Sequence, residues 1–278
     1  MAEVHEVVPD GDVRLIFGSE ENGNSTHILV SPVVLSFGSP EGATLASGTR
    51  LDLPLPEDCP EGMLAICEVM HMKTPTYPTP SVDSLLQVAL LVDKYDCRAA
   101  MCFAMKIWMQ SVEGKLLVRD SLNLFIIAYL MDFRKSFSKY GRVLVADTEP
   151  EFNLTPPDCI PETLQRAIET LSDSRQQLRK ELVSKFEEVI DEECAGSDDF
   201  IGACDEDCDY FSTRLYNFMA KLKKTPLWPL TRSMDQSLQN ILAALLKFPS
   251  EWAEAVSPCD DGLYQDNCNE QTTSIIKD

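Results

Sequence analysis

Polar and apolar residues alternate near the start of the chain, over residues 12–17 (DVRLIF). The alternation follows the turn-forming pair Asp10-Gly11 and predicts a strand that is buried on one face. Residues 18–25 are polar and contain two Gly and two Asn, which is typical of a turn. Residues 26–30 (THILV) are rich in aliphatic and β-branched side chains, so we expect them to complete a β-hairpin with the first strand.

A short apolar run and a short strand follow the hairpin. Residues 32–39 (PVVLSFGS) begin with a proline, which suits the first turn of a helix, and they predict a short buried helix. Residues 51–55 (LDLPL) predict a third strand, and Pro54 restricts it to a sheet edge because proline donates no hydrogen bond to a neighbouring strand. No element is predicted before residue 10, and His5 is expected to lie in a disordered end.

Beyond the third strand, the hydrophobic period changes from that of strands to that of helices. Residues 60–70 predict a helix with Asp58 as its candidate N-cap. Ser81 is the expected N-cap of a second helix over residues 82–94, and residues 99–109 predict a third. A hairpin, a short helix, an edge strand and three helices define an α+β fold in which helices pack on a small sheet.

The second half of the chain predicts helices almost throughout. Residues 111–147 are expected to form a helical extension of the N-terminal domain. Residues 148–161 contain four prolines and predict a Pro-rich linker. Residues 162–256 then predict a C-terminal helical region with an acidic, cysteine-bearing loop, and residues 257–278 a disordered polar tail.

Residues 162–193 predict one long amphipathic helix with an apolar stripe. The stripe consists of Leu164, Ile168, Leu171, Leu178, Leu182, Phe186 and Val189. One interpretation is a coiled coil that dimerises the protein. We favour the other, a helix that packs against its own chain, because Arg175 and Lys185 interrupt the stripe. The repeat also barely exceeds the roughly three to four heptads that indicate a coiled coil.

Charge limits the classes of partner. The chain carries 24 Lys and Arg against 45 Asp and Glu, a formal net charge of −21. Such a charge repels phosphate backbones and anionic lipid surfaces, so we expect no nucleic acid and no membrane as partner, and a partner recognised by charge would be basic. The sequence starts without the features of a secretory signal and contains no apolar run of membrane-spanning length.

A cytoplasmic or nuclear location is therefore expected, and the ten cysteines are expected as thiols. Four of them, Cys59, Cys67, Cys97 and Cys102, fall in apolar segments and are expected to be small core residues.

No sequence motif indicates catalysis. The chain has no P-loop, no dinucleotide-binding glycine fingerprint, no zinc-protease motif and no nucleophile elbow. Its histidines His5, His27 and His71 have no neighbouring nucleophile in a recognisable motif, and His71 is expected at a helix C-terminus. We therefore expect neither an enzyme nor a cofactor.

An alternative is a zinc-stabilised regulatory protein that uses its C-terminal cysteines. Cys194, Cys204 and Cys208 lie in or beside an acidic segment, and thiolates and carboxylates both bind zinc. Their spacing contains no close pair of the kind typical of zinc sites, so an ordinary acidic loop is the favoured interpretation.

Three sequence blocks resemble the BTB/POZ domains of filamentous fungi. The first joins residues 11–15 (GDVRL) to residues 30–40 (VSPVVLSFGSP). The second is residues 53–71, from LPLPEDCPEGM to VMH, and the third is residues 90–97 (LLVDKYDC). The blocks have the family's order and the right elements between them. The resemblance covers residues 10–110 and implies a BTB/POZ-like small sheet capped by helices.

The resemblance implies protein–protein interaction, because the family self-associates and docks partners, in many members as substrate adaptors of a cullin ubiquitin ligase. We expect a homodimer through the first helix, at Val33, Val34 and Phe37. We expect partners, a cullin among them, to dock on the face of the next two helices. The candidate residues there are Met63, Ile66, Met70, Leu85, Leu86 and Tyr95.

The chain departs from the family's pattern after Pro40. Where the family has a second helix, about a dozen residues or three turns long, Ser39-Pro40 runs directly into Glu41-Gly42. An alternative splice form or a mis-assembled gene model would produce the same string. The loss of the helix would expose an apolar groove or remove a partner site. A third interpretation is therefore a non-functional variant with a truncated BTB/POZ fold.

Overall fold

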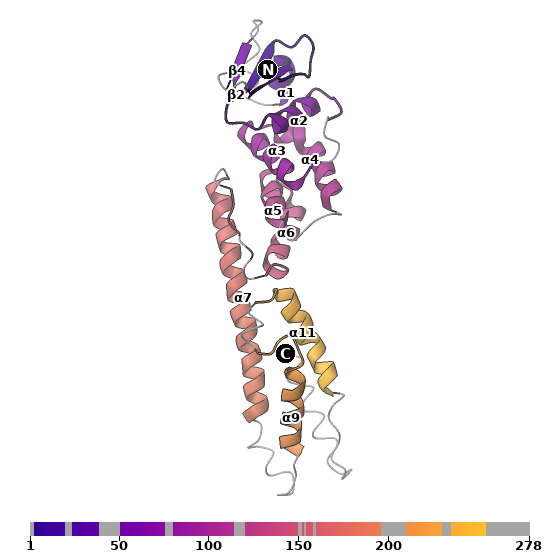
Figure 1. The fold of residues 1–278 in the computed structure, drawn as a ribbon, viewed down its shortest axis with the longest axis vertical. Coiled ribbons are helices and arrows are strands. Elements are labelled where there is room, and N and C mark those ends of the chain that lie inside the picture. Colours follow the sequence, from indigo (N-terminus) through magenta and orange to yellow (C-terminus); the bar gives the residue numbers. More distant parts are fainter. Residues whose placement is uncertain are drawn as a thin grey trace. The chain divides into compact units, whose positions relative to one another are not determined.

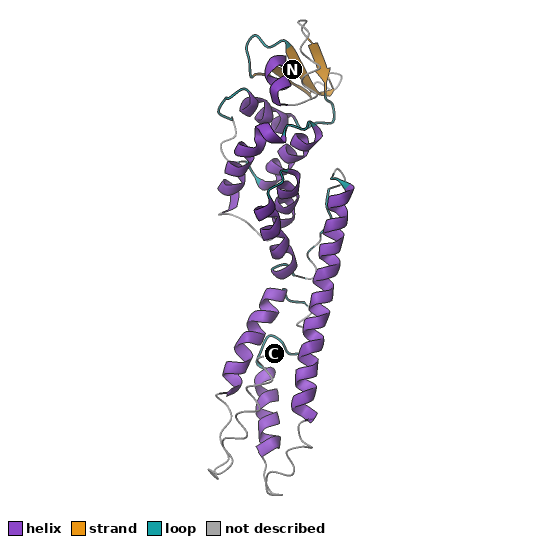
Figure 2. Ribbon diagram, turned by 180° about the vertical axis from the view of Figure 1, so that it is seen from behind, coloured by secondary structure: helices purple, strands orange, loops and turns teal. Residues whose placement is uncertain are grey.

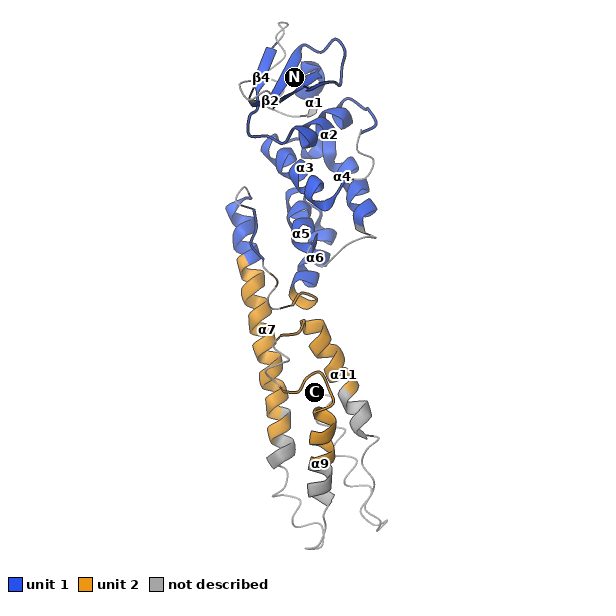
Figure 3. Cartoon of the chain, viewed as in Figure 1, with its two compact units in different colours: residues 1–144, 154–168 blue, residues 145–153, 169–278 orange. Residues whose placement is uncertain are grey.

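The computed structural model describes residues 3–19, 24–38, 51–75, 80–113, 120–149, 152, 154–157, 160–195, 210–229 and 235–253. The chain divides into two compact units, shown in Figure 3. Unit 1 comprises residues 1–144 and 154–168, and unit 2 comprises residues 145–153 and 169–278. The described residues form one four-stranded sheet and nine helices, so the α+β class is as predicted. The position of the missing second helix, after Pro40, lies outside these residues.

The sheet belongs to unit 1 and has the strand order β1-β3-β2-β4. β2 (Val13–Ser19) and β3 (Asn24–Val30) are antiparallel neighbours, which confirms the predicted hairpin. β4 (Leu51–Pro54) pairs in parallel with β2 and forms one edge, so Pro54 interrupts no interior ladder. Figure 2 shows the strands gathered at one end of unit 1.

The opposite edge of the sheet is β1 (Glu3–Glu6), which the sequence does not predict. β1 pairs in parallel with β3, with His5 opposite Ile28, so the expectation that His5 lies in a disordered end is wrong. The strand contains one aliphatic side chain, Val4, and therefore has almost no hydrophobic pattern. Its pairing rests on the backbone groups that an open edge of β3 would otherwise leave unpaired.

β2 has the alternation that its sequence predicts. Val13, Leu15 and Phe17 are at most 3% exposed, whereas Arg14 and Ile16 between them are half-buried. Successive side chains of a strand point to opposite faces, so one face of β2 belongs to the core and the other is partly open to solvent.

A layer of helices accompanies the sheet (Figure 1). They are α1 (Pro32–Gly38), α2 (Pro60–Met70), α3 (Val82–Lys94) and α4 (Arg98–Glu113), in the predicted order. The expectation that the first helix is buried is wrong, because Val33 is exposed and Val34 and Leu35 are half-buried. α2 contacts α1, α3, α4 and β3, and it therefore connects the helical layer to the sheet.

The N-termini of α2 and α3 are stabilised differently. At α3 the predicted cap is confirmed, because the Ser81 hydroxyl accepts a 3.1 Å hydrogen bond from the Ser84 amide. At α2 the predicted cap is wrong: Cys59 is the N-cap, and it makes no side-chain cap bond. Asp58, whose side chain is 5% exposed, instead accepts a 2.6 Å bond from Lys94 Nζ and a bond from the Tyr95 hydroxyl. Asp58 thus ties the start of α2 to the end of α3.

The predicted helical extension contains α5 (Ser121–Leu130) and α6 (Arg134–Ala146). α5 is apolar and almost entirely buried, and it packs against α3. Phe125 of α5 stacks on Phe137 of α6 with 4.3 Å between the ring centroids. These contacts extend the helical core of unit 1 beyond α4.

Two of the four cysteines expected in the core are fully interior. Cys67 and Cys97 are buried, and burial raises the pKa of the Cys67 thiol to about 12 and that of Cys97 to about 11. Cys59 and Cys102 are half-buried, and all four are free. The neutral thiol form is therefore favoured at Cys67 and Cys97, as in small hydrophobic residues.

Unit 2 is helical. The predicted long helix is α7 (Glu162–Ala195), whose residues from Glu169 onward belong to this unit. α9 (Tyr210–Leu222) and α11 (Leu238–Ala253) follow. Their buried cluster consists of Phe186, Phe218, Leu222, Leu227 and Ile241. Phe186 of the α7 stripe therefore packs against its own chain, in line with the favoured interpretation.

Of the two residues that interrupt the α7 stripe, Lys185 is exposed and Arg175 is buried. Arg175 is 3% exposed, and Arg179, one turn further on, is 2% exposed. Arg175 Nη1 donates a 2.8 Å bond to the Thr148 hydroxyl, and Arg179 Nη2 donates a 2.6 Å bond to the Thr148 carbonyl. Arg175 also donates to the Phe152 carbonyl at 3.1 Å, and Arg179 to the Gln236 carbonyl at 3.3 Å. The two guanidinium groups thus join three segments of unit 2.

The predicted Pro-rich linker, residues 148–161, contains buried positions. Thr148 is 0%, Leu154 9% and Ile160 8% exposed. Thr148 belongs to unit 2, and the other two belong to unit 1. The linker residues are therefore partly built into the folded units.

Candidate interaction surface

Unit 1 has a hollow beside α1 with a volume of about 450 Å³. We call it the α1 hollow, and its lining residues are Val8, Val34, Met70, His71, Met72, Lys73 and Ala100. They come from the segment after β1, from α1, from the end of α2 and from α4. The lining is mostly aliphatic and sulfur-containing, which is the composition of a surface that excludes water on contact.

His71 fixes the geometry of the hollow. It is the C-cap of α2, so its predicted place at a helix C-terminus is confirmed. Its Nε2 accepts a 3.1 Å bond from the backbone amide of Ser31, the residue that precedes α1. Because a backbone amide donates only, the ring hydrogen lies on Nδ1, which donates to the Cys67 carbonyl at 2.7 Å. His71 is therefore neutral in this arrangement and connects α1 to α2.

We expect the stability of unit 1 to fall as the pH drops below about 6.5, the ordinary pKa of histidine. Burial, with a contribution from Lys73, lowers the pKa of His71 in the folded chain. The unfolded chain therefore binds a proton first, and acid favours unfolding. Urea titrations at pH 7.5, 6.5 and 5.5 should show a smaller loss of stability in His71→Gln than in the parent chain. His5 and His27 remain in both proteins, so an equal loss in both would contradict the assignment.

Further exposed apolar side chains lie close to the residues that line the α1 hollow. Met72, at its rim, is 96% exposed, and its backbone has φ 55°, a left-handed conformation that non-glycine residues rarely adopt. Val33, next to Val34 on α1, is 55% exposed. On α4, Phe103 lies three residues beyond Ala100, on the same helical face, and it is 77% exposed. The hollow is therefore part of a larger apolar surface.

Three residues predicted for interaction lie at this surface. Val34 and Met70 line the α1 hollow, and Val33 is exposed beside it. The side chain of Phe37, predicted with them, lies outside the described residues.

The predicted docking face of α2 and α3 requires a correction. Met63, Ile66, Leu85 and Leu86 are at most 6% exposed, so they fill the core and present no surface to a partner. Tyr95 is half-buried, and its hydroxyl donates to Asp58. The resemblance pointed to this face, and hydrophobic periodicity identifies an apolar face but not whether the chain itself covers it.

The sequence prediction missed Phe103 and Ala100 of α4. On α4 the buried residues Met101 and Met105 mark the core face, and Phe103 lies between them on the opposite side of the helix. Ile107, four residues after Phe103, is 49% exposed. Phe103 and Ile107 therefore form a second apolar stripe on the side of α4 that faces away from the core. This stripe is the sequence signal that could have identified the exposed surface.

Most of the candidate zinc ligands are not among the residues that the structure describes. Cys204 and Cys208 are not among the described residues, and only the backbone of Cys194, in α7, is described. Among the residues that the structure does describe, no group of three or more His, Cys, Asp or Glu side chains is arranged to hold a metal ion. The zinc hypothesis remains a prediction for the C-terminal cysteines.

The fold and surface define a mixed α+β protein with an apolar hollow beside α1 in its sheet-bearing unit. No protein-family model matches the sequence, and a search of curated proteins finds no match. Within the described ranges, no helix has both the length and the apolar character needed to cross a membrane.

Proposed function

We propose that this protein is a non-enzymatic interaction module of the BTB/POZ type that self-associates through the α1 hollow. The observation that carries the proposal is the apolar surface around α1, where Val34 and Met70 line the hollow and Val33 and Met72 are exposed beside it. An exposed apolar patch of this kind on a folded domain typically marks a contact with another protein.

The order of the elements supports the BTB/POZ assignment. The first resembling block falls on β2 and on the end of β3 with α1, the second on β4 and α2, and the third on the end of α3. Each block thus occupies elements of the type that the resemblance implies. The role of substrate adaptor on a cullin ligase is part of the same proposal and rests on the resemblance.

The distribution of charge supports a second copy of the chain as the partner that covers the α1 hollow. Two chains with a net charge of −21 repel each other, so a stable contact needs a surface that lacks carboxylates. The described lining of the α1 hollow contains no Asp or Glu, and it contains one cation, Lys73. The hollow is therefore a place where two copies of this acidic chain can approach without opposing negative side chains.

We expect Val33→Asp to convert a dimer into a monomer. A carboxylate buried without a partner costs several kcal/mol, and about 1.4 kcal/mol corresponds to a tenfold change in affinity. The dissociation constant should therefore rise roughly 100-fold or more. Light scattering of the full-length chain over a range of concentrations measures the mass, and circular dichroism of the same samples reports folding.

Val4→Asp is the matched control, because Val4 is 52% exposed, close to the 55% of Val33, and lies outside the lining of the hollow. It adds the same negative charge and should leave the dimer intact. Val34→Asp, inside the hollow, should dissociate the dimer as Val33→Asp does. A parent chain that is folded but monomeric at all concentrations would contradict the proposal, as would a Val34→Asp protein that is both folded and fully dimeric.

A further inference from the structure

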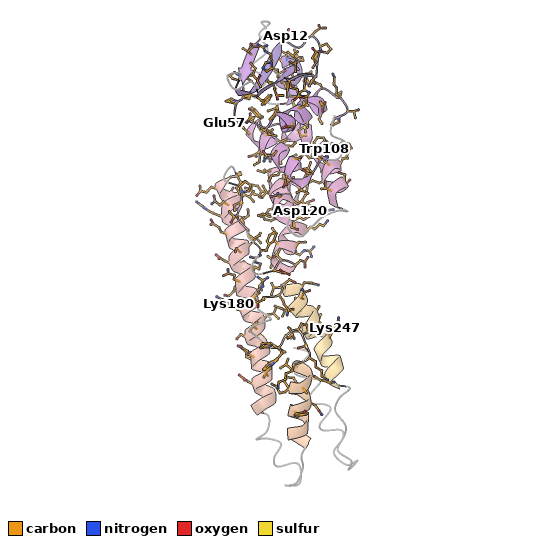
Figure 4. The ribbon with its side chains drawn as sticks, viewed as in Figure 1. Asp12, Glu57, Trp108, Asp120, Lys180 and Lys247 are labelled. Atoms are coloured by element: carbon orange, nitrogen blue, oxygen red, sulfur yellow. The ribbon has the colours of Figure 1, made fainter. Side chains whose placement is uncertain are left out.

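A second depression of unit 1 lies where α2 and α3 begin. We call it the α2–α3 groove. Its volume is about 410 Å³, within the roughly 300–1,000 Å³ of ligand pockets. Its apolar side chains include Ala65 of α2, Val88 of α3 and Trp108 of α4, which is labelled in Figure 4. The groove shares no lining residue with the α1 hollow, so it is a separate surface.

The charged side chains that line the groove are both acidic. Glu61 lies in the first turn of α2 and Asp83 in the first turn of α3, and both residues are exposed. Glu61 Oε2 accepts a 3.3 Å bond from the Cys59 thiol, and Asp83 Oδ1 accepts a 2.9 Å bond from Asn123 Nδ2. A carboxylate offers about four acceptor positions, so both retain capacity for a further donor.

Trp108 gives the groove an aromatic surface. The residue is 8% exposed, so most of its ring is held within unit 1 and a small part is open to solvent. A cation beside an indole ring is attracted by the ring's π-electrons. Apolar and aromatic side chains bordered by carboxylates are complementary to a side chain with an apolar stem and a cationic end.

We propose that the α2–α3 groove binds a basic linear peptide, with a Lys or Arg side chain inserted between Glu61 and Asp83. The stem of such a side chain covers apolar surface while its charged end remains in polar surroundings. The open part of Trp108 and the half-buried Pro80 provide the apolar contacts, and the two carboxylates pair with the cation. This inference goes beyond self-association and does not depend on it.

A second copy of the chain does not fit this groove as well as a basic peptide does. The carboxylates at its rim would face a chain of the same net charge, −21, and would repel it. The α1 hollow, which lacks carboxylates in its described lining, does not have this disadvantage. The two surfaces are therefore suited to different partners.

The test uses Gln87, an exposed residue that lines the groove on α3. Glu61 and Asp83 are unsuitable for a first test, because acidic residues in the first turn also stabilise their own helices. The probe is a short acetylated and amidated peptide of Ala, Leu and Lys. Its affinity for the full-length chain is measured by calorimetry at two salt concentrations, and NMR follows the indole resonance of Trp108.

Gln87→Lys should weaken binding of the basic peptide about tenfold, and Gln87→Glu should strengthen it a few-fold. The indole signal of Trp108 should shift on titration. Gln165→Lys is the control, because Gln165 is an exposed residue of α7 outside the groove and the change in net charge is the same. It should reduce the affinity by less than twofold.

Three results would overturn the inference. The first is equal weakening by Gln87→Lys and Gln165→Lys, which would show a general attraction to an acidic chain. The second is equal binding of a matched peptide in which Glu replaces Lys. The third is the absence of any binding of the basic peptide at millimolar concentration to a chain that circular dichroism shows to be folded.

Discussion

Leu85→Ala is expected to lower the free energy of unfolding by about 2–5 kcal/mol, the usual cost of truncating a fully buried leucine. Leu85 is 0% exposed and lies on α3, which packs against α2, α4 and α5. The loss combines the transfer of buried methyl groups with the cavity that close-packed neighbours fail to fill. Urea unfolding followed by circular dichroism and by tryptophan fluorescence measures it.

Truncation of Val33 to alanine provides the comparison with Leu85→Ala. Measured at concentrations where the chain is monomeric, Val33→Ala should change stability by less than about 0.5 kcal/mol, because exposed side chains contribute little to folding and Val33 is 55% exposed in the single chain. The pair distinguishes core from surface among residues that the sequence placed together as candidates for interaction. A Leu85→Ala protein of unchanged stability would show that this side chain is not in the core.

Thr148→Val is expected to destabilise unit 2 by about 1.5–3 kcal/mol, the cost of removing a hydrogen bond to a charged group. Thr148 is 0% exposed, and its hydroxyl accepts from Arg175 Nη1 at 2.8 Å. Valine keeps the shape of the side chain but has no acceptor, so the buried guanidinium loses a partner. Hydrogen exchange measured by mass spectrometry should show faster exchange in α7 after residue 168 and in α11.

A double-mutant cycle isolates the interaction between Thr148 and Arg175. Arg175→Met removes the buried charge, so Thr148→Val should cost less in that background than in the parent chain, and the two changes should not add. Replacing a buried ionic group with an apolar one can itself be neutral. Strict additivity would mean that Arg175 and Thr148 stabilise unit 2 independently.

Arg175 and Arg179 also explain how α7 differs from a coiled coil. Burial lowers the pKa of both guanidinium groups, and for Arg179 the proximity of Arg175 adds to the effect. Each side chain donates to backbone carbonyls, and the carbonyls belong to segments of the same chain. A helix face that binds its own loops in this way is not available to the α7 of a second copy of the chain.

Local features of the sequence determined most of the secondary structure. The alternation in residues 12–17 predicted β2, the polar turn after it predicted the hairpin, and Pro54 predicted an edge strand. Ser81 predicted the N-terminus of α3 correctly, because its hydroxyl bonds an amide three residues away. These signals depend on residues close together in the sequence and need no knowledge of distant contacts.

The tertiary structure alone decided which apolar faces are covered. Leu85 and Val33 both lie on apolar stretches, yet one is fully buried and the other is 55% exposed. Asp58 had the position of a helix cap but bonds Lys94 and Tyr95, 36 and 37 residues away. β1 forms because β3 offers it an edge, and Arg175 is buried because Thr148 and Phe152 accept its hydrogen bonds. Hydrophobic periodicity specifies which face of a helix or strand is apolar. Whether that face is buried depends on which other elements the fold packs against it.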